Sequence, residues 1–378
     1  MTRTDWSVPE TEVLSGVGDA LDAGRDDVLA TVIDVEGNAY RRPGAKMLIR
    51  DDDTAGSITA GCLEDEVARL GREVRETGDP HVETYDLTGD DDALWGRGMG
   101  CNGIITVLLE PITESYRPVV DASAAGEDIG VVTVVDGDRL GERAYYTPEE
   151  EFAGGLTDDL RDELAEPTAG LLAEGNSDTI RIETDDGTIE VFVDGIRAPS
   201  HLVIFGSGPD VEPVVDLATR VELRVTVVSF RGAHASEERF PEADTVRSSS
   251  PTDVRAVVDF DDDTHAVVMT HNFVDDRLVL EELLDTRTPY IGLMGPQERF
   301  EELLEEFVED GVAVAEDDFE RIYTPIGLDL GGESPSRIAY SIVGEVLAVA
   351  NGRTPGHLTE REEPIHDRLD FDVEIAPE

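Results

Sequence analysis

The feature that most constrains the fold is an alternation of short apolar strands and helical segments that begins at His201. The first strand, Leu202 to Phe205, leads directly into Gly206-Ser207-Gly208, and a helical segment follows. Further apolar strands are expected at Arg224 to Val228, Ala266 to Thr270 and Tyr290 to Met294. This alternation predicts a parallel sheet with helices on both of its faces.

The last helix of this region has a clear start and end. Ser334 is a suitable N-cap, Pro335 occupies the first helical position, and Asn351-Gly352 follows the last apolar residue. We therefore predict a parallel-sheet domain over residues 199–354. Residues 355–378 are polar and acidic, and we expect them to form a tail.

The residues before this domain show a different pattern. Two strands are expected at Thr179 to Thr184 and Thr188 to Val193, because Asp185-Asp186-Gly187 between them is a hairpin signal. Together with the earlier strands and helices they predict an α+β domain over residues 1–198, with a polar insertion near residues 147–176. The fold class expected for the whole chain is α/β.

The chain carries 86 acidic and 30 basic residues, which gives a formal net charge of −56. The acids are spread along the whole length, and 39% of the residues are hydrophobic, so ordinary cores are expected under an acidic surface. Such a surface is typical of a halophile, and we expect a halophilic archaeal source. Its repulsion of phosphates argues against nucleic acid as a partner.

No segment predicts export or membrane insertion. Met1 to Gly24 lacks the apolar core of a signal peptide, and no run approaches the roughly 20 apolar residues of a membrane span. Two cysteines make no disulfide framework. We therefore expect a cytoplasmic protein that does not bind membranes.

Both cysteines lie in glycine-rich segments. Cys62 follows Gly61 just before a helical repeat, and Cys101 lies in Gly96 to Gly103. A thiol at a helix start or in a nest of backbone N–H groups ionises more easily, and the thiolate is the reactive form. The alternative for either cysteine is a small buried side chain that fills a tight turn.

Lys46 is the only lysine of the chain, and Arg41 and Arg42 lie close to it in the sequence. Since the other 29 basic residues are arginine, this single lysine indicates a role that needs a compact point charge, such as contact with a phosphate. We therefore predict an anion site at this cluster. The alternative is a lysine without function on a surface strand.

Gly206 and Gly208 have the context of a dinucleotide-binding turn, but the pattern fails twice. Val211 stands at the third glycine position, and Ser229 replaces the carboxylate expected at the end of the second strand. Use of NAD(P) is therefore disfavoured. His271, at the carboxyl end of a later strand, is a candidate for a ligand contact or a proton relay, or alternatively a loop residue with one structural hydrogen bond.

In their order and spacing, these segments resemble the XdhC/CoxI family, accessory factors of molybdenum hydroxylases such as xanthine dehydrogenase and aerobic CO dehydrogenase. The resemblance covers most of the chain. It is carried by Arg42-Pro43-Gly44-Ala45-Lys46-Met47-Leu48, Gly61-Cys62-Leu63-Glu64, Cys101-Asn102-Gly103, Ile204-Phe205-Gly206-Ser207-Gly208, Val268-Met269-Thr270-His271, Tyr290-Ile291-Gly292-Leu293-Met294-Gly295, Pro325-Ile326-Gly327-Leu328-Asp329 and Asn351-Gly352-Arg353.

The resemblance implies a carrier rather than a catalyst. It implies a homodimer that binds the molybdenum cofactor, helps its sulfuration and delivers it to an apo molybdenum hydroxylase, with a cysteine desulfurase as a further partner. A soft thiolate of Cys62 or Cys101 would suit contact with molybdenum. The candidate cofactor-binding residues are Arg42, Lys46, Gly61, Cys62, Glu64, Cys101, Gly206, Gly208, His271 and Asp329.

The chain departs from the family pattern in its second domain. Pro209 replaces a histidine, Ser229 replaces an aspartate, and the basic run after Gly295 becomes Pro296-Gln297-Glu298-Arg299. These changes argue against a nucleotide-binding role of this domain and leave open whether the chain still handles the cofactor. Two alternatives to the carrier stay open. One is an NAD(P)-dependent oxidoreductase that uses the Rossmann-like domain, and the other is a non-catalytic dimeric adaptor.

Overall fold

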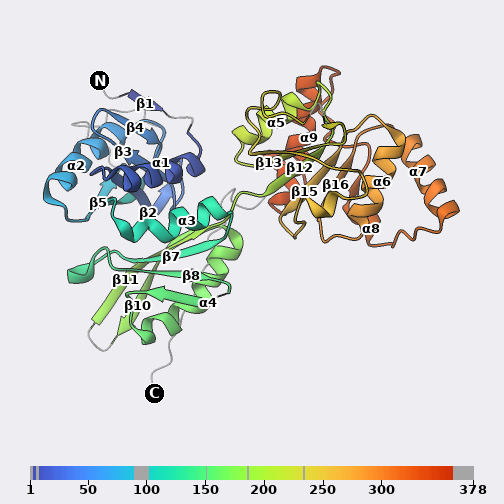
Figure 1. Cartoon of the computed structure of the whole chain (residues 1–378). Helices are drawn as coiled ribbons and strands as arrows, with labels where there is room; N and C mark the ends of the chain where they lie inside the picture. The colour runs from blue at the N-terminus through green and yellow to red at the C-terminus, as the bar shows by residue number, and fades with distance from the viewer. Residues whose placement is uncertain are drawn as a thin grey trace. The chain divides into compact units, whose positions relative to one another are not determined.

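The computed structural model describes residues 3–5, 8–88, 102–149, 151–184, 187–232 and 235–360. The chain divides into two compact units, Met1–Ala198 and Pro199–Glu378 (Figure 1). The predicted α/β class is confirmed, because helices accompany one mixed and one antiparallel sheet in the first unit and a parallel six-stranded sheet in the second.

The sheet of the second unit is parallel throughout. Its strands, in the order β14-β13-β12-β15-β16-β17, are β12 (His201–Phe205), β13 (Arg224–Ser229), β14 (Thr245–Ser248), β15 (Thr264–Val268), β16 (Tyr290–Leu293) and β17 (Ile322–Tyr323). The chain moves outward from β12 to β14 and then returns to β15 on the other side of β12. In open α/β sheets, ligands bind at the carboxyl ends of the strands beside such a reversal.

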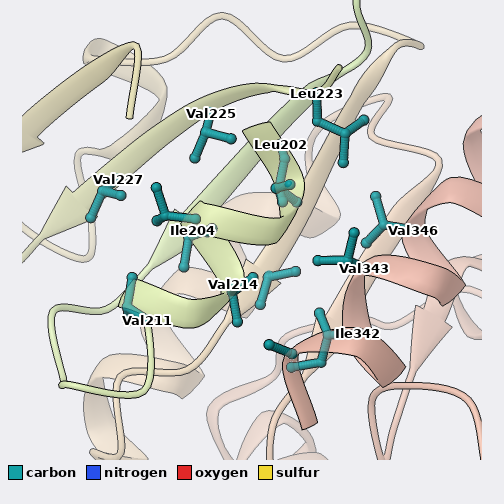
Figure 2. Close-up of a cluster of buried hydrophobic side chains, with 14 of the residues drawn as sticks. Leu202, Ile204, Val211, Val214, Leu223, Val225, Val227, Ile342, Val343 and Val346 are labelled. Atoms are coloured by element: carbon teal, nitrogen blue, oxygen red, sulfur yellow. The ribbon is translucent and has the colours of Figure 1, made fainter. Parts of the chain in front are cut away.

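Helices cover both faces of this sheet because successive residues of its strands point to opposite sides. Leu202 and Ile204 pack with α5 (Glu212–Arg220) and α9 (Pro335–Ala350), as Figure 2 shows. Val203 and Phe205 pack on the other face. There they meet α6 (Phe273–Leu284) and α7 (Gln297–Asp310), and α8 (Asp318–Arg321) precedes β17.

The first unit contains two sheets. The first has the order β1-β4-β3-β2-β6-β5 and consists of β1 (Arg3–Asp5), β2 (Val28–Asn38), β3 (Lys46–Ile49), β4 (Asp53–Gly56), β5 (His81–Asp86) and β6 (Asn102–Pro111). Only β1 and β4 pair in parallel within the described part of this sheet. Two helices, α1 (Glu10–Ala23) and α2 (Glu64–Thr77), bury their apolar residues in separate cores against its strands.

The second sheet of this unit is antiparallel, in the order β10-β11-β7-β8-β9. It consists of β7 (Ile129–Val134), β8 (Arg143–Thr147), β9 (Glu151–Gly154), β10 (Ser177–Thr184) and β11 (Gly187–Ile196). Ile33 and Leu108 of the first sheet pack with Val135 and Phe192, so a core joins the two sheets.

Two helices accompany the second sheet, α3 (Arg117–Ala125) and α4 (Asp158–Glu174). The segment 147–176, predicted as a polar insertion, contains β9 and α4. The helix buries Leu160, Leu164, Leu171 and Leu172. Its apolar face therefore contributes to the core of the first unit, although most of its other residues are polar.

Candidate functional site

The loop that joins β4 to α2 is organised by the carboxylate of Glu64. This side chain is buried, and its Oε1 accepts a hydrogen bond from the Thr59 amide at 2.8 Å. Its Oε2 accepts from the Thr59 hydroxyl at 2.6 Å and from the Leu63 amide at 3.2 Å. The carboxylate thus closes the loop, and it accepts one of these hydrogen bonds from the N-cap residue of α2, where a negative charge is favourable.

Cys62 lies in this loop and is half-buried. It packs against the apolar cluster that contains Leu63 and Val67, while Gly61 before it has a left-handed φ of +94°. The structure therefore brings Gly61, Cys62 and Glu64 into one compact turn. Cys101, the second predicted thiol, lies outside the described residues.

Tyr85, on strand β5, packs against the same cluster as Cys62. Its hydroxyl is buried and has no hydrogen-bond partner among the described residues. Burial raises the pKa of Tyr85 to about 12, and the charges of Glu83 and Glu66 add to this effect. Sequence reasoning missed this residue because it predicted no strand at β5.

Lys46 occupies a buried ion pair in the first unit. Its Nζ lies 2.8 Å from Asp194 Oδ2 and 2.8 Å from Glu10 Oε1, and it donates to the Gly44 carbonyl at 2.8 Å. Burial by itself lowers the pKa of Lys46, but the charges of Asp194 and Glu10 outweigh it and raise the pKa.

These contacts account for all three N–H donors of the Lys46 ammonium. Arg42, in contrast, is an exposed residue. The structure therefore does not bring Lys46 and Arg42 together at one anion site, and it gives Lys46 the role of joining β3 to α1 and β11. The sequence pattern shows that Lys46 is exceptional, but it does not show how deeply the lysine is buried.

The carboxyl edge of the parallel sheet is the second candidate region. Gly206 ends β12 so close to β15 that an added Cβ would lie 2.6 Å from the Met269 carbonyl oxygen. At Gly208, an added Cβ would lie 2.3 Å from Asp210 Oδ1. Gly206 is thus required by its close approach to a backbone oxygen, whereas the atom near Gly208 is the end of a flexible carboxylate side chain that can move.

Asp210 and His271 form a pair at this edge. His271 Nε2 lies 2.7 Å from Asp210 Oδ2, and 56% of the histidine side chain is exposed. His271 has a left-handed φ of +57°, a conformation that is uncommon outside glycine and is frequent at functional sites. Sequence reasoning identified His271 but missed Asp210, whose only signal is its place two residues after Gly208.

A buried carboxylate holds the turn that leads to His271. Asp276 on α6 is 1% exposed, and its Oδ1 accepts a hydrogen bond from the Thr270 hydroxyl. Its Oδ2 accepts from Arg299 Nη2 at 2.6 Å. This ion pair connects the carboxyl end of β15 to α7, so the position of His271 depends on packing between three elements.

Ser229, at the end of β13, is fully buried. Its hydroxyl lies 3.0 Å from Ser207 Oγ and 3.1 Å from the Arg231 carbonyl oxygen. A dinucleotide site presents a carboxylate to the ribose at this position. Here the position holds a serine instead, and its hydroxyl stabilises the glycine turn. A pyrophosphate over Gly208 would also meet the Asp210 carboxylate, so this edge is unfavourable for a dinucleotide.

Asp329, the last predicted residue, is exposed in the loop before α9. The loop is fixed by backbone contacts: the Gly327 amide donates to Glu345 Oε2 at 2.8 Å, and the Leu328 amide donates to the Ser341 carbonyl at 3.2 Å. The Tyr290 hydroxyl donates to the same Glu345 oxygen at 2.8 Å. Asp329 therefore follows two residues that hydrogen bonds hold against α9.

Two further features are absent from the described residues. They contain no group of three or more histidine, cysteine, aspartate or glutamate side chains arranged to hold a metal ion. None of the helices within the described ranges is both long enough and apolar enough to span a bilayer.

Comparison with known proteins connects both candidate regions to one family. Residues 20–86 match the model of the XdhC and CoxI family, and residues 202–346 match that of the XdhC Rossmann domain. A Bacillus subtilis protein, named as a probable subunit of xanthine dehydrogenase, is 30% identical over 336 residues, which cover 86% of this chain and 94% of that protein.

A more distant relative and a solved structure agree with this match. The Escherichia coli molybdenum cofactor insertion chaperone PaoD is 22% identical over 333 residues, which cover 88% of this chain and 86% of that protein. The crystal structure of a Bacillus halodurans protein named a xanthine dehydrogenase is 28% identical, with a TM-score of 0.72. The match covers 91% of this chain and 96% of that one.

Proposed function

Since the chain belongs to the XdhC and CoxI family, we propose that it is an accessory factor that binds the molybdenum cofactor and delivers it to a molybdenum hydroxylase. In this proposal the cofactor is cargo, which the chain protects and helps to sulfurate. Its partners are the apo-hydroxylase and a second copy of the chain, with a cysteine desulfurase as the source of sulfur.

One structural observation carries the proposal. Cys62 is half-buried in a turn that three hydrogen bonds to Glu64 hold in place. A thiolate is a soft ligand suited to molybdenum, and a fixed loop lowers the entropy cost of binding cargo there. The names of the Bacillus subtilis and Escherichia coli relatives support the same role.

The test is the molybdenum and pterin content of the full chain, purified anaerobically in molar KCl from a host that makes the cofactor. Cys62→Ser and Cys101→Ser are purified in parallel. Asp65→Asn is the matched control, because Asp65 is exposed in the first turn of the helix that follows Cys62 but carries no thiol. We expect pterin and molybdenum near one per chain, lowered by at least one cysteine change and unchanged in the control.

Other outcomes distinguish the alternatives. Folded wild-type protein without pterin, but with bound dinucleotide, would replace the proposal by an NAD(P)-dependent oxidoreductase. Folded protein with neither ligand, which still activates an apo-hydroxylase, would favour an adaptor. An equal pterin content in the wild type and in both cysteine variants would show that the cargo does not bind at the thiols.

A further inference from the structure

The first unit contains an internal cavity of about 20 Å³ between its two sheets. Its walls include two cationic side chains, Lys46 and Arg143, and two threonines, Thr31 and Thr133, all of them buried. The carboxylates of Glu110 and Asp194, the ring of Tyr116 and apolar side chains of α1, α3 and the strands of both sheets complete the lining. Polar groups from both sheets thus meet in a space that the function proposed above does not use.

Arg143 is only partly satisfied in this interior. Its side chain is 5% exposed, and its Nη2 donates to both carboxylate oxygens of Glu110 at 2.6 Å. Glu110 also accepts a hydrogen bond from the Tyr116 hydroxyl at 2.7 Å. The other two nitrogens of the guanidinium, Nε and Nη1, are buried and have no hydrogen-bond partner among the described residues. Unpaired buried donors of this kind destabilise a fold unless ordered water satisfies them.

The two threonines supply further groups that can bind water. Thr31 lies on β2 and is 5% exposed, and Thr133 lies on β7 and is 4% exposed. One threonine from each sheet therefore lines the same cavity as Arg143.

We infer that this cavity binds one ordered water molecule that links Arg143 to the hydroxyls of Thr31 and Thr133. A water needs about 10–15 Å³ of such space and two to four polar partners, and the cavity offers both. An ion is disfavoured, because Arg143 is paired with Glu110 and Lys46 with Asp194, so the lining carries no net positive charge. The water would complete the hydrogen bonds that join the two sheets.

The test is a crystal structure of the full chain at a resolution that shows ordered solvent, with bromide replacing chloride in the medium. We expect a density peak in the cavity, within hydrogen-bond distance of Arg143 and both hydroxyls, without anomalous signal from bromide. A bromide signal there would show a halide site, and an empty cavity in well-ordered density would show a dry one. Either of these results overturns the inference.

Isosteric variants test which side chains hold the water. Thr31→Val and Thr133→Val keep the volume of each side chain and remove its hydroxyl, so the double variant should lose the peak. The matched control is Thr84→Val, at an exposed residue of β5 that does not line the cavity, and this variant should keep the peak. A water peak that remains at full occupancy in the double variant would contradict the assigned partners.

Discussion

Replacing Lys46 by methionine removes a buried charge and keeps a side chain of similar length. The Lys46 ammonium lies 2.8 Å from Asp194 Oδ2 and 2.8 Å from Glu10 Oε1, and its side chain is 3% exposed. The substitution leaves the Asp194 carboxylate, which is 9% exposed, without its cation. Asp194 would retain one hydrogen bond, from the Ser177 hydroxyl at 2.7 Å.

The expected cost follows from the burial of each partner. Removing one member of a buried ion pair costs about 3–5 kcal/mol, because the remaining charge stays desolvated. The Glu10 side chain is 35% exposed, so water screens it and its loss adds only about 0–1 kcal/mol. We therefore expect Lys46→Met to lower the free energy of unfolding by about 3–5 kcal/mol, a large part of the roughly 5–15 kcal/mol of a typical domain.

The assay is urea unfolding at constant KCl, followed by circular dichroism. The double variant Lys46→Met with Asp194→Asn should recover part of the loss, because no unpaired charge is left. Arg69→Met is the matched control: Arg69 pairs with Glu66 at 2.6 Å on the exposed face of α2, and we expect no measurable loss. A change below about 1 kcal/mol in Lys46→Met would refute the buried-pair reasoning.

Three further predictions concern other parts of the chain. Burial, more than nearby charge, lowers the pKa of His201 to about 4, so stability that is complete above about pH 6.5 should fall as the pH drops. We expect about 2 kcal/mol of extra loss between pH 7.5 and pH 5, absent in His201→Gln, as measured by urea unfolding. Glu64→Gln weakens the Cys62 loop and should speed thiol modification in a Cys101→Ser background, whereas the exposed-site control Asp65→Asn should not. Gly206→Ala forces a Cβ to 2.6 Å from a backbone oxygen, and we expect a loss of at least about 2 kcal/mol or no soluble protein.

Three results would contradict these predictions. An equal pH dependence in wild type and His201→Gln would show that other groups cause the acid sensitivity. Unchanged thiol reactivity in Glu64→Gln would show that hydrogen bonds to its carboxylate do not control the loop, and a wild-type melting temperature in Gly206→Ala would show that β12 and β15 can separate without cost.

Much of the second unit could be predicted because its signals are local. The continuous apolar run Leu202–Phe205 can be buried only between two layers of helices, and the structure packs its residues on both faces of the sheet. Ser334 and Pro335 were expected to start the last helix, and they occupy the N-cap and the first position of α9. The predicted contribution of Cys101 to the site stays a prediction.

The sequence by itself determined which residues are exceptional: the single lysine, the glycines after β12 and the histidine after β15. Only the tertiary structure decided what they contact. Lys46 meets Asp194 from another sheet, and His271 meets Asp210 from the turn after the first strand of its unit. The reason is that desolvation and charge pairing depend on depth and on neighbours distant in the chain, and neither leaves a periodic signal in the order of residues.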